Sequence, residues 1–395
     1  MSPVPDVFIV GGARTPMTGF IGALKDLSAV ELGATAARGA FEKTGVKPGW
    51  IDQVIIGNVL HTSADAVYGA RHVALKAGVP VEVPALTVNR LCGSGIQAAV
   101  TGAQLIQLGE ANIVLTGGVE NMSQAPHVLR GLRAGLKMGN ARLEDSLLEG
   151  LRDSYCDCTM AMTAENVAAK YGITRAEQDA YALRSQQLAA KAWADGRFSD
   201  EVVPVQTQTR KGVEIVHRDD HLRPETTADA LAKLAPAFKK DGTVTAGNAS
   251  GIVDGGAALI LASAAAIAGN GVRPLGKLLG WAVCGVEPAL MGMGPAPATR
   301  AVLKKLKITL ADVDLIEVNE AFAAQYLAVE KELGLDRNKV NVNGGAIALG
   351  HPLGMTGTRL LLTLLLELRR RGRKRGLAAA CIGGGQGIAA VVEAV

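Results

Sequence analysis

Aromatic residues and cysteines are scarce in this chain, and no long apolar run is present. Phe, Trp and Tyr make up 4% of the 395 residues, and the five cysteines are an odd number. So few cysteines in so long a chain argue against a disulfide framework. The apolar run at 360–368 is far too short to span a bilayer. We therefore expect a protein with free thiols and no membrane partner.

A strong charge of one sign is also missing, since the formal net charge is only +4. That balance gives no reason to expect a nucleic-acid partner. The one dense basic stretch, at 369–375, follows the apolar run, where cations complement the C-terminal end of a helix dipole. The beginning of the chain lacks the plan of a signal peptide, and a strand at 7–10 leaves no room for an organellar presequence. We expect a cytoplasmic location.

Metal and cofactor chemistry has little support in the sequence. Cys156 and Cys158 form a lone C-x-C pair without a second pair of ligands, which is a weak metal signal. We expect no metal and no bound cofactor.

Short apolar strands alternate with helices in the first part of the chain. Strands are predicted at 7–10, 52–59, 84–89 and 112–118, and a helix at about 96–108. A further helix is predicted from Ser28, which forms an S-x-x-E capping box with Glu31, to a stop at Gly45. This alternation predicts an α/β fold with a sheet buried on both faces.

The second half repeats this order. Residues 51–58 resemble 313–320, and the strand, glycine turn and helix that begin at 87–89 resemble those that begin at 341–343. The segment 112–118 resembles 377–385. We interpret this as a duplicated α/β unit, although buried strands in general resemble one another. The segment 121–250 is more charged and less strand-like, and we expect it to be an insertion that covers the active site. It contains a predicted helix from Thr174 to Ala194, with Thr174 and Glu177 as a capping box.

Two cysteines stand at the mouths of glycine-rich turns. Cys92 is followed by Gly93 and Gly95 and then by a predicted helix, so free backbone N–H groups should surround an exposed sulfur and lower its pKa. The same N–H groups would form an oxyanion hole. Such a thiol is a candidate nucleophile, and the alternative is a small buried hydrophobe.

A cysteine nucleophile needs a base, and the glycine-rich loop 341–354 offers one. His351 stands before Pro352, which restrains the backbone that aims the imidazole. Cys381 supplies a second thiol, able to exchange a proton with carbon, for which a hydrolase has no need. Asn319 ends a predicted strand, where its carboxamide can hold a water molecule or polarise a carbonyl, although it can equally be a turn residue.

Taken together, these segments resemble the thiolase family over essentially the whole chain. The motifs that carry the resemblance stand in thiolase order and spacing: NRLCGSG (89–95), GNASGIVDGGAA (247–258), NEAFA (319–323), NVNGGAIALGHPLG (341–354) and CIGGGQG (381–387), extended by GGARTP (11–16), TGGVENMS (116–123) and TAENVA (163–168). In motif detail the chain is most similar to the mitochondrial-type 3-ketoacyl-CoA thiolases.

The resemblance implies the thiolase fold, in which two duplicated α/β halves form a five-layered αβαβα core with an inserted loop domain. We expect an N-terminal half of residues 1–120 plus 251–271, a loop domain of 121–250 that binds CoA, and a C-terminal half of 272–395. It also implies a homo-oligomer, a tetramer built from dimers.

The implied activity is that of an acyltransferase in fatty acid β-oxidation. It would cleave 3-ketoacyl-CoA with CoA, or condense acetyl-CoA, through an acyl-cysteine intermediate. Cys92 would be the nucleophile, His351 its activator and Cys381 the acid/base thiol. Asn319 with a water molecule and His351 would line one oxyanion hole, and the N–H groups of Cys92 and Gly383 the other.

By this resemblance CoA and acyl-CoA are substrates. The residues that would contact them are those at positions that match the CoA-binding positions of the family. The resemblance places these residues along the bound thioester: Met160, Arg223, Ser250, Met291 and Phe322. Thr159 stands where acetoacetyl-CoA thiolases commonly have a histidine, which favours a broader range of acyl chains. The competing hypotheses are a ketoacyl-synthase-type condensing enzyme, a cysteine-dependent thioester hydrolase and an inactive CoA-binding scaffold.

Overall fold

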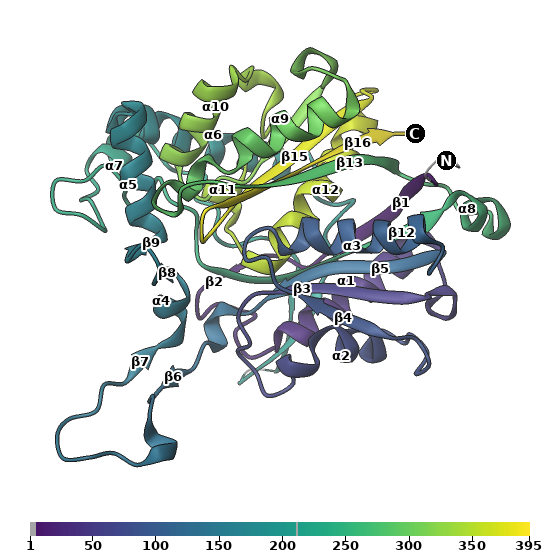
Figure 1. The fold of residues 1–395 in the computed structure, drawn as a ribbon, viewed down its shortest axis with the longest axis horizontal. Coiled ribbons are helices and arrows are strands. Elements are labelled where there is room, and N and C mark those ends of the chain that lie inside the picture. The colour runs from purple at the N-terminus through teal and green to yellow at the C-terminus, as the bar shows by residue number, and fades with distance from the viewer. Residues whose placement is uncertain (1–4, 211) are drawn as a thin grey trace.

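The computed structural model describes residues 5–210 and 212–395. Ten strands form one continuous sheet that folds into two layers, with helices between and outside them (Figure 1). The N-terminal layer contains, in spatial order, β4 (Ala85–Val88), β3 (Gln53–Asn58), β5 (Ile113–Glu120), β12 (Val253–Ser263) and β1 (Val7–Arg14), with β2 (Thr18–Gly19) beside β12. The C-terminal layer continues with β13 (Gly276–Gly285), β16 (Gln386–Ala394), β15 (Arg375–Ile382) and β14 (Leu315–Val318).

The helices make the alternation of layers expected for the thiolase fold. Helices α3 (Ser94–Leu108) and α12 (Leu353–Arg370) pack against each other between the two layers of the sheet. On the outer faces lie α1 (Ala29–Thr44) and α2 (Gly69–Lys76) in the N-terminal half, and α9 (Pro295–Leu306) with α10 (Ala323–Leu333) in the C-terminal half. These two halves also contain the shorter helices α8 (Ala264–Asn270) and α11 (Ala346–Leu349). The predicted fold class is confirmed.

The duplication is visible in the strand order and in matching hydrogen bonds. Each half pairs its strands in a corresponding sequence, β3–β5–β12–β1 in one and β14–β15–β16–β13 in the other. Asp52 accepts from the backbone N–H of Asn112, 60 residues further on, and Asp314 accepts from that of Lys374, again 60 residues further on. Each carboxylate thus holds the start of one parallel strand beside the start of the next. A general likeness between buried strands would not produce this matching hydrogen bond.

One repeated segment differs from the prediction. Residues 341–343, which resemble the strand at 87–89, form no strand, and only isolated parallel bridges occur here, from Val340 to Ile316 and from Val342 to Gly344. Asn341 has a φ of 47° and Gly344 a φ of 77°, both in the left-handed region. This turn is incompatible with an extended strand, and it directs the chain toward His351.

Local helix signals in the sequence are borne out. Ser28 and Glu31 form the expected capping box at α1, which ends at Gly45 with a φ of 72°. Thr174 and Glu177 form the second one, at α6 (Arg175–Ala194). The side chains of Thr174 and Glu177 satisfy backbone N–H groups that a helix start leaves unpaired.

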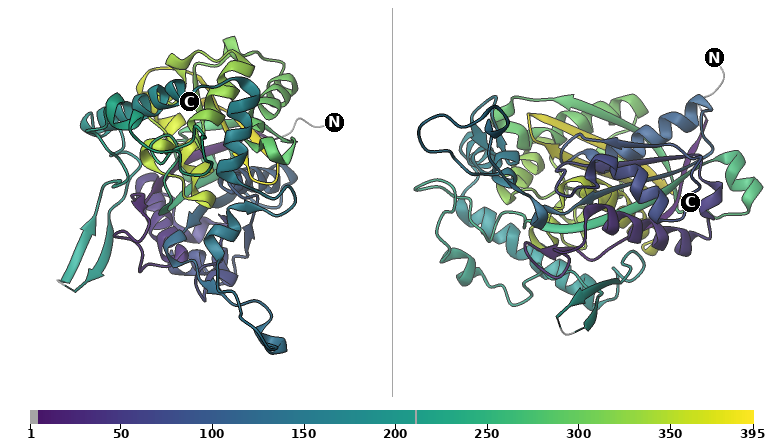
Figure 2. Two further views of the ribbon diagram at one scale, coloured as in Figure 1. Left: turned by 90° about the vertical axis from the view of Figure 1, so that its left-hand side faces the viewer. Right: turned by 90° about the horizontal axis from the view of Figure 1, so that it is seen from below.

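Between β5 and β12 the chain forms an irregular, largely helical region. It contains α4 (Ser146–Gly150), α5 (Met160–Tyr171), α6 and α7 (Ala228–Ala232), and three hairpins: β6 (His127–Val128) with β7 (Glu144–Asp145), β8 (Arg152–Asp153) with β9 (Cys158–Thr159), and β10 (Val205–Thr209) with β11 (Gly212–Val216). The β6–β7 arm and the β10–β11 hairpin both project from the body (Figure 2). Helix α5 packs against α10, so this region covers the C-terminal half near β14.

A fully buried ion cluster anchors this region to the N-terminal half. Arg14, at the end of β1, donates to Glu201 at 2.7 Å and to Asp219 at 2.7 Å and 3.0 Å. All three side chains are at most 1% exposed. Because the guanidinium satisfies both carboxylates at once, the desolvation cost of burying these charges is offset.

Candidate active site

Cys92 lies on a tight turn between β4 and α3. The preceding residue, Leu91, has a φ of 45°, which is unfavourable for a residue with a side chain. Ser94 holds the turn, because its hydroxyl accepts from the N–H of Arg90 at 2.8 Å and donates to the carbonyl of Leu91 at 2.7 Å. The turn therefore fixes the sulfur at the N-terminal end of a 15-residue helix.

The turn that carries Cys92 packs directly against the strand that carries Cys381. A Cβ atom on Gly93 would lie 2.5 Å from the side chain of Ile382, so a larger residue there would require Ile382 to move. The backbone N–H groups of Gly383 and of Cys92 itself face the Cys92 sulfur and lower the pKa of its thiol. Two donors from different halves of the molecule thus converge on one sulfur atom.

Burial nevertheless reverses the pKa shift expected for Cys92. Loss of solvation is the largest effect and raises the pKa of the thiol to about 11, and the nearby Glu120 carboxylate also raises it. The predicted low-pKa thiolate was wrong, because the N–H groups do not compensate for the loss of water. The residue is only partly exposed, so the resting group is a shielded thiol.

Cys381, at the end of β15, is 0% exposed, which corrects the expectation of an exposed sulfur. Burial raises the pKa of its thiol, and the neighbouring Cys92 raises it further. Its hydrophobic surroundings include Met160, Met291 and Phe322. Three of the predicted substrate contacts therefore surround the second thiol.

The hydrogen bonds of His351 assign its tautomer. The hydroxyl of Thr356 donates its one proton to the carbonyl of Pro352 at 3.0 Å. It therefore accepts from Nδ1–H of His351, 2.6 Å away. This leaves the lone pair on Nε2, which faces the Nδ2 amide of Asn319 at 3.2 Å. Burial, together with the positive charge of Arg359, lowers the pKa of His351 to about 3, so the resting ring is neutral.

Asn319 follows β14 and is fully buried. With its amide nitrogen directed at His351, its Oδ1 atom has no hydrogen-bond partner among the described residues. An unpartnered buried acceptor is costly, and a water molecule would satisfy it. This agrees with the water-holding role expected from the sequence.

A buried carboxylate that sequence reasoning did not single out supports this arrangement. Glu120, at the end of β5, accepts from the backbone N–H of Gly354 at 2.8 Å, of Leu60 at 2.9 Å and of Val59 at 3.2 Å. Asn58 adds a side-chain bond at 3.0 Å. Glu120 thereby joins the start of α12, beside His351, to the loop after β3.

Burial raises the pKa of the Glu120 carboxyl to about 7, although these hydrogen bonds lower it. Glu120 belongs to the motif TGGVENMS (116–123), and this motif was the signal in the sequence by which it could have been found.

The remaining predicted CoA contacts differ in their surroundings. The backbone N–H of Ser250 donates to the carbonyl of Ala321, and its hydroxyl has no partner in the described part of the chain. Arg223 is exposed, and its guanidinium donates to the carbonyls of Asp220 and Leu222. Thr159 caps α5 by accepting from the N–H of Met162. Ser250 is thus free to bind a ligand, whereas Arg223 would have to exchange partners.

Metal-binding groups and membrane-spanning helices are both absent from residues 5–210 and 212–395. No group of three or more His, Cys, Asp or Glu side chains there has the arrangement of a metal site. The helices of that part are all too short or too polar to cross a bilayer.

Family models match almost the whole chain. The thiolase N-terminal domain matches residues 7–265, and the thiolase C-terminal domain matches residues 272–394. The human mitochondrial 3-ketoacyl-CoA thiolase is 52% identical over 394 residues, covering 100% of this chain and 99% of the relative. The acetyl-CoA acetyltransferase of Chromobacterium violaceum is 53% identical, covering 98% and 99%.

Solved structures give the same result. A crystal structure of the human mitochondrial 3-ketoacyl-CoA thiolase in complex with CoA has a TM-score of 0.97 at 52% identity and covers 99% of this chain and 98% of that one. The Bacillus anthracis acetyl-CoA acetyltransferase has a TM-score of 0.97 at 46% identity, with 99% of both chains covered.

The relatives correct one expectation from the sequence. The predicted cytoplasmic location was wrong, since the human and bovine relatives, at 52% and 51% identity, are named as mitochondrial.

Proposed function

The chain belongs to the thiolase family, and from that premise we propose how its own residues perform the reaction. The protein is an acyltransferase that cleaves 3-ketoacyl-CoA with CoA, giving acetyl-CoA and a shortened acyl-CoA, or runs the reverse Claisen condensation. The convergence of two backbone N–H groups on the Cys92 sulfur, with a second thiol beside it, supports the assignment of roles.

In the first half-reaction, Cys92 transfers its proton to Nε2 of His351, and the sulfur attacks the 3-keto carbon. The N–H groups of Cys92 and Gly383 stabilise the resulting oxyanion. Its collapse breaks the bond between C2 and C3, which leaves the electron pair on C2. Cys381 protonates C2, acetyl-CoA departs, and the acyl group stays on Cys92.

In the second half-reaction, the thiol of CoA transfers its proton to the Cys381 thiolate and attacks the acyl group. His351 returns its proton to the departing Cys92 sulfur, so both thiols and the imidazole regain their starting states. In the condensing direction, Asn319 with a bound water and His351 stabilise the enolate oxygen of the second acetyl-CoA. The neutral resting imidazole suits this cycle, because it begins as an acceptor.

Removing each thiol separately tests these roles. Replacing Cys92 by Ser should prevent acyl-enzyme formation and lower the kcat of thiolysis by about a thousandfold or more. Replacing Cys381 by Ala should preserve labelling of Cys92 by radioactive acetyl-CoA while lowering thiolysis comparably. Labelling and steady-state thiolysis of acetoacetyl-CoA measure both effects.

The same Cys381→Ala variant separates the alternatives. Nearly intact thiolysis together with new thioesterase activity would contradict the thiolase roles and favour a cysteine hydrolase. Full condensing activity with that variant would favour a ketoacyl-synthase-type enzyme, which does not need this thiol. Absence of thiolysis by the unmodified protein would favour the inactive scaffold.

We further propose that the enzyme accepts 3-ketoacyl chains longer than four carbons. Thr159 supports this, because it caps α5 directly before Met160 instead of offering the histidine common in acetoacetyl-CoA thiolases. Relatives of both kinds are equally similar, at 52% and 53% identity. The test is kcat/KM for thiolysis across 3-ketoacyl-CoAs of increasing length. A steep fall beyond four carbons would contradict the proposal.

The CoA contacts and the domain boundaries are proposals of the same kind. We propose that Ser250 binds the pantetheine arm, that Met160, Met291 and Phe322 line the acyl and pantetheine path, and that Arg223 lies near the adenine end. We divide the chain into an N-terminal half (1–120 plus 251–271), a loop domain (121–250) that binds CoA, and a C-terminal half (272–395).

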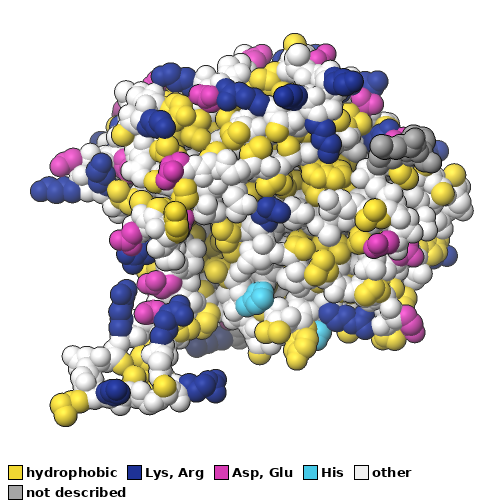
Figure 3. All heavy atoms as spheres, in the orientation of Figure 1, with side chains coloured by type: hydrophobic (Ala, Val, Ile, Leu, Met, Phe, Trp, Pro, Cys, Tyr) yellow, Lys and Arg dark blue, Asp and Glu magenta, His cyan; other side chains and the backbone are white. Residues whose placement is uncertain are grey.

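We also propose a homotetramer built from dimers. The arm between β6 and β7 supports it, because its apolar residues project into solvent with basic side chains around them (Figure 3). Met138 is 104% exposed and Leu143 64%, and Leu132 and Leu136 are also exposed. A cluster of apolar side chains on a protruding loop is characteristic of a contact surface.

A further inference from the structure

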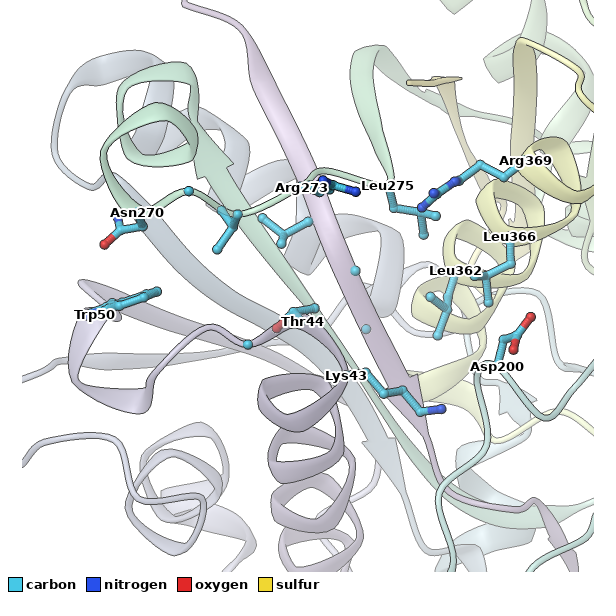
Figure 4. A pocket seen from close by; sticks show the side chains of 16 residues that line it. Lys43, Thr44, Trp50, Asp200, Asn270, Arg273, Leu275, Leu362, Leu366 and Arg369 are labelled. Carbon is cyan, nitrogen blue, oxygen red and sulfur yellow. The ribbon is translucent and has the colours of Figure 1, made fainter.

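A cavity of about 660 Å³ lies where the two halves of the molecule meet, and it contains none of the residues assigned to thiolysis. We call it the junction cavity. Lys43, Arg273 and Arg369 line it together with Trp50 and Asn270, and the side chains of Leu275, Leu362 and Leu366 form an apolar wall (Figure 4). Its volume lies within the range of small-molecule sites.

The path of β1 explains why the cavity exists. This strand pairs with β13 only at Phe8 and Ile9, and its register with β12 shifts between Ile9 and Gly11. Among the described residues, no strand pairs with this edge of β1 from there until Arg14 forms a bridge to Val202, and Gly11 and Gly12 line the opening without side chains. A Cβ atom on Gly11 would lie 2.8 Å from the Thr44 side chain, so a larger residue would crowd the wall.

The three cations of the junction cavity are not neutralised by the protein. Among the described residues, Lys43, Arg273 and Arg369 form no ion pair, and Lys43 donates only to the carbonyl of Ser199. Asp200 also lines the cavity, but it pairs with Arg370 at 3.0 Å. All three residues are exposed, so an anion that enters from solvent can reach them.

Helix dipoles do not account for the whole cluster. Lys43 and Arg369 stand in the last turns of α1 and α12, where cations are generally favourable. Arg273 lies in the connection between α8 and β13, and Figure 4 shows its head directed toward that of Arg369 across β1. Two arginines from separate elements, neither with a carboxylate partner among the described residues, thus offer donors to an anion.

The basic stretch at 369–375 divides accordingly. Arg370 and Arg371 pair with Glu367, and Lys374 and Arg375 pair with Glu393. Arg369 is the residue of this stretch that lines the cavity. Most of the basic stretch therefore stabilises the fold, and Arg369 is available to a ligand.

The opposite end of the cavity offers an aromatic ring and an amide acceptor. Trp50 is partly buried, with the ammonium group of Lys47 over its ring. Asn270 donates its Nδ2 to the carbonyl of Ala266 at 3.0 Å, which leaves its Oδ1 free to accept. A ring for stacking and an acceptor for an exocyclic amine suit an adenine base, and the arginines suit phosphate oxygens.

We propose that the junction cavity binds an adenine nucleotide, with the base at Trp50 and Asn270 and the phosphates between Lys43, Arg273 and Arg369. Free ATP or ADP has both an adenine base and phosphates, and so does the adenosine phosphate end of CoA. The site is separate from the thiolysis site and independent of the roles proposed for Cys92 and Cys381.

Isothermal titration calorimetry on the full chain tests the site, with ATP, tripolyphosphate and adenosine as separate probes. The unmodified protein should bind ATP more tightly than either fragment. The double variant Arg273→Ala/Arg369→Ala should lose about tenfold or more of the ATP affinity. The matched control is Arg373→Ala, which removes a neighbouring arginine outside the cavity. This variant should retain the ATP affinity of the unmodified protein. Unchanged thiolysis kinetics and circular dichroism establish that the variants are folded.

Three results would overturn the proposal: no heat with ATP at millimolar concentration, equal ATP affinity in the double variant, or equal affinity for tripolyphosphate and ATP. Replacing Trp50 by Ala should weaken the binding of ATP but not the binding of tripolyphosphate. Titration with CoA shows whether the ligand of the cavity is a free adenine nucleotide or the adenosine phosphate end of CoA. Two CoA sites per chain in the unmodified protein and one in the double variant identify CoA as a ligand of the cavity, whereas one site in both with ATP binding intact identifies free nucleotides.

Discussion

At the scale of single residues, burial decides the chemistry of the two thiols. Sequence reasoning recognised Cys92, His351, Asn319 and Cys381 from their motifs but assigned the wrong direction to the Cys92 pKa. A motif shows which donors stand beside a sulfur, but not how much water the rest of the molecule excludes from it. The outcome is a neutral thiol at Cys92 and a neutral imidazole at His351.

Alkylation should report this directly. The thiolate is the reactive form, and the pKa of Cys92 is raised to about 11, so its rate with iodoacetamide should rise about tenfold per pH unit between pH 7 and 9. Cys381, which is more deeply buried with a raised pKa, should react more slowly throughout. Peptide mapping by mass spectrometry measures both rates.

The denatured chain is the control, since thiols there titrate near their ordinary pKa of about 8.5. A rate for Cys92 that levels off below pH 8 in the folded protein would instead indicate a preformed thiolate–imidazolium pair.

Glu120 shows what residue-level motifs leave out. Its position in TGGVENMS was visible, but its partners come from the loop after β3 and from the start of α12. Only folding brings these N–H groups together around one carboxylate. No local pattern around Glu120 predicts such a set of donors.

At the scale of elements, local rules predicted the helices and strands well. Capping boxes at Ser28 and Thr174 gave the starts of α1 and α6, because these signals act within one turn of the chain. The segment 341–343 failed as a strand because its left-handed turn depends on the surrounding loop. The β6–β7 arm gave no distinctive signal in the sequence, and most of its residues are exposed.

The arm should matter for assembly. Replacing Leu136 and Met138 by Ser should reduce the mass measured by light scattering, because it removes exposed apolar surface from the proposed contact. Thermal unfolding of the dissociated subunits should still be cooperative. The control is Val213→Ser on the β10–β11 hairpin, another exposed apolar residue on a projecting element. An unchanged mass for the arm variant would exclude the arm as the contact.

At the scale of the whole molecule, buried charges join the inserted region to the core. Arg14 connects β1 to Glu201 and Asp219 of that region. Arg359 forms a second buried pair with Glu317 between α12 and β14. Such pairs contribute orientation, because each charge is tolerated only when its partner is in place.

Replacing Arg14 by Ala should therefore be strongly destabilising. It leaves two buried carboxylates without a cation, which costs about 3–5 kcal/mol. Arg14→Lys should lose less, because the charge remains although the bidentate geometry does not. Arg300→Ala breaks an exposed pair with Glu332 and should cost only about 0–1 kcal/mol. Thermal unfolding at constant protein concentration compares the three, and similar losses for Arg14→Ala and Arg300→Ala would contradict the assigned role.

The sequence by itself determined the alternation of strands and helices, the duplicated halves and the motifs that place the chain among thiolases, because these depend on local periodicity and on short motifs. The tertiary structure decided the neutral state of Cys92 and His351, the support from Glu120 and the junction cavity. Each of these depends on how much water is excluded and on which distant segments meet. Those quantities belong to the packed molecule and not to any stretch of its sequence.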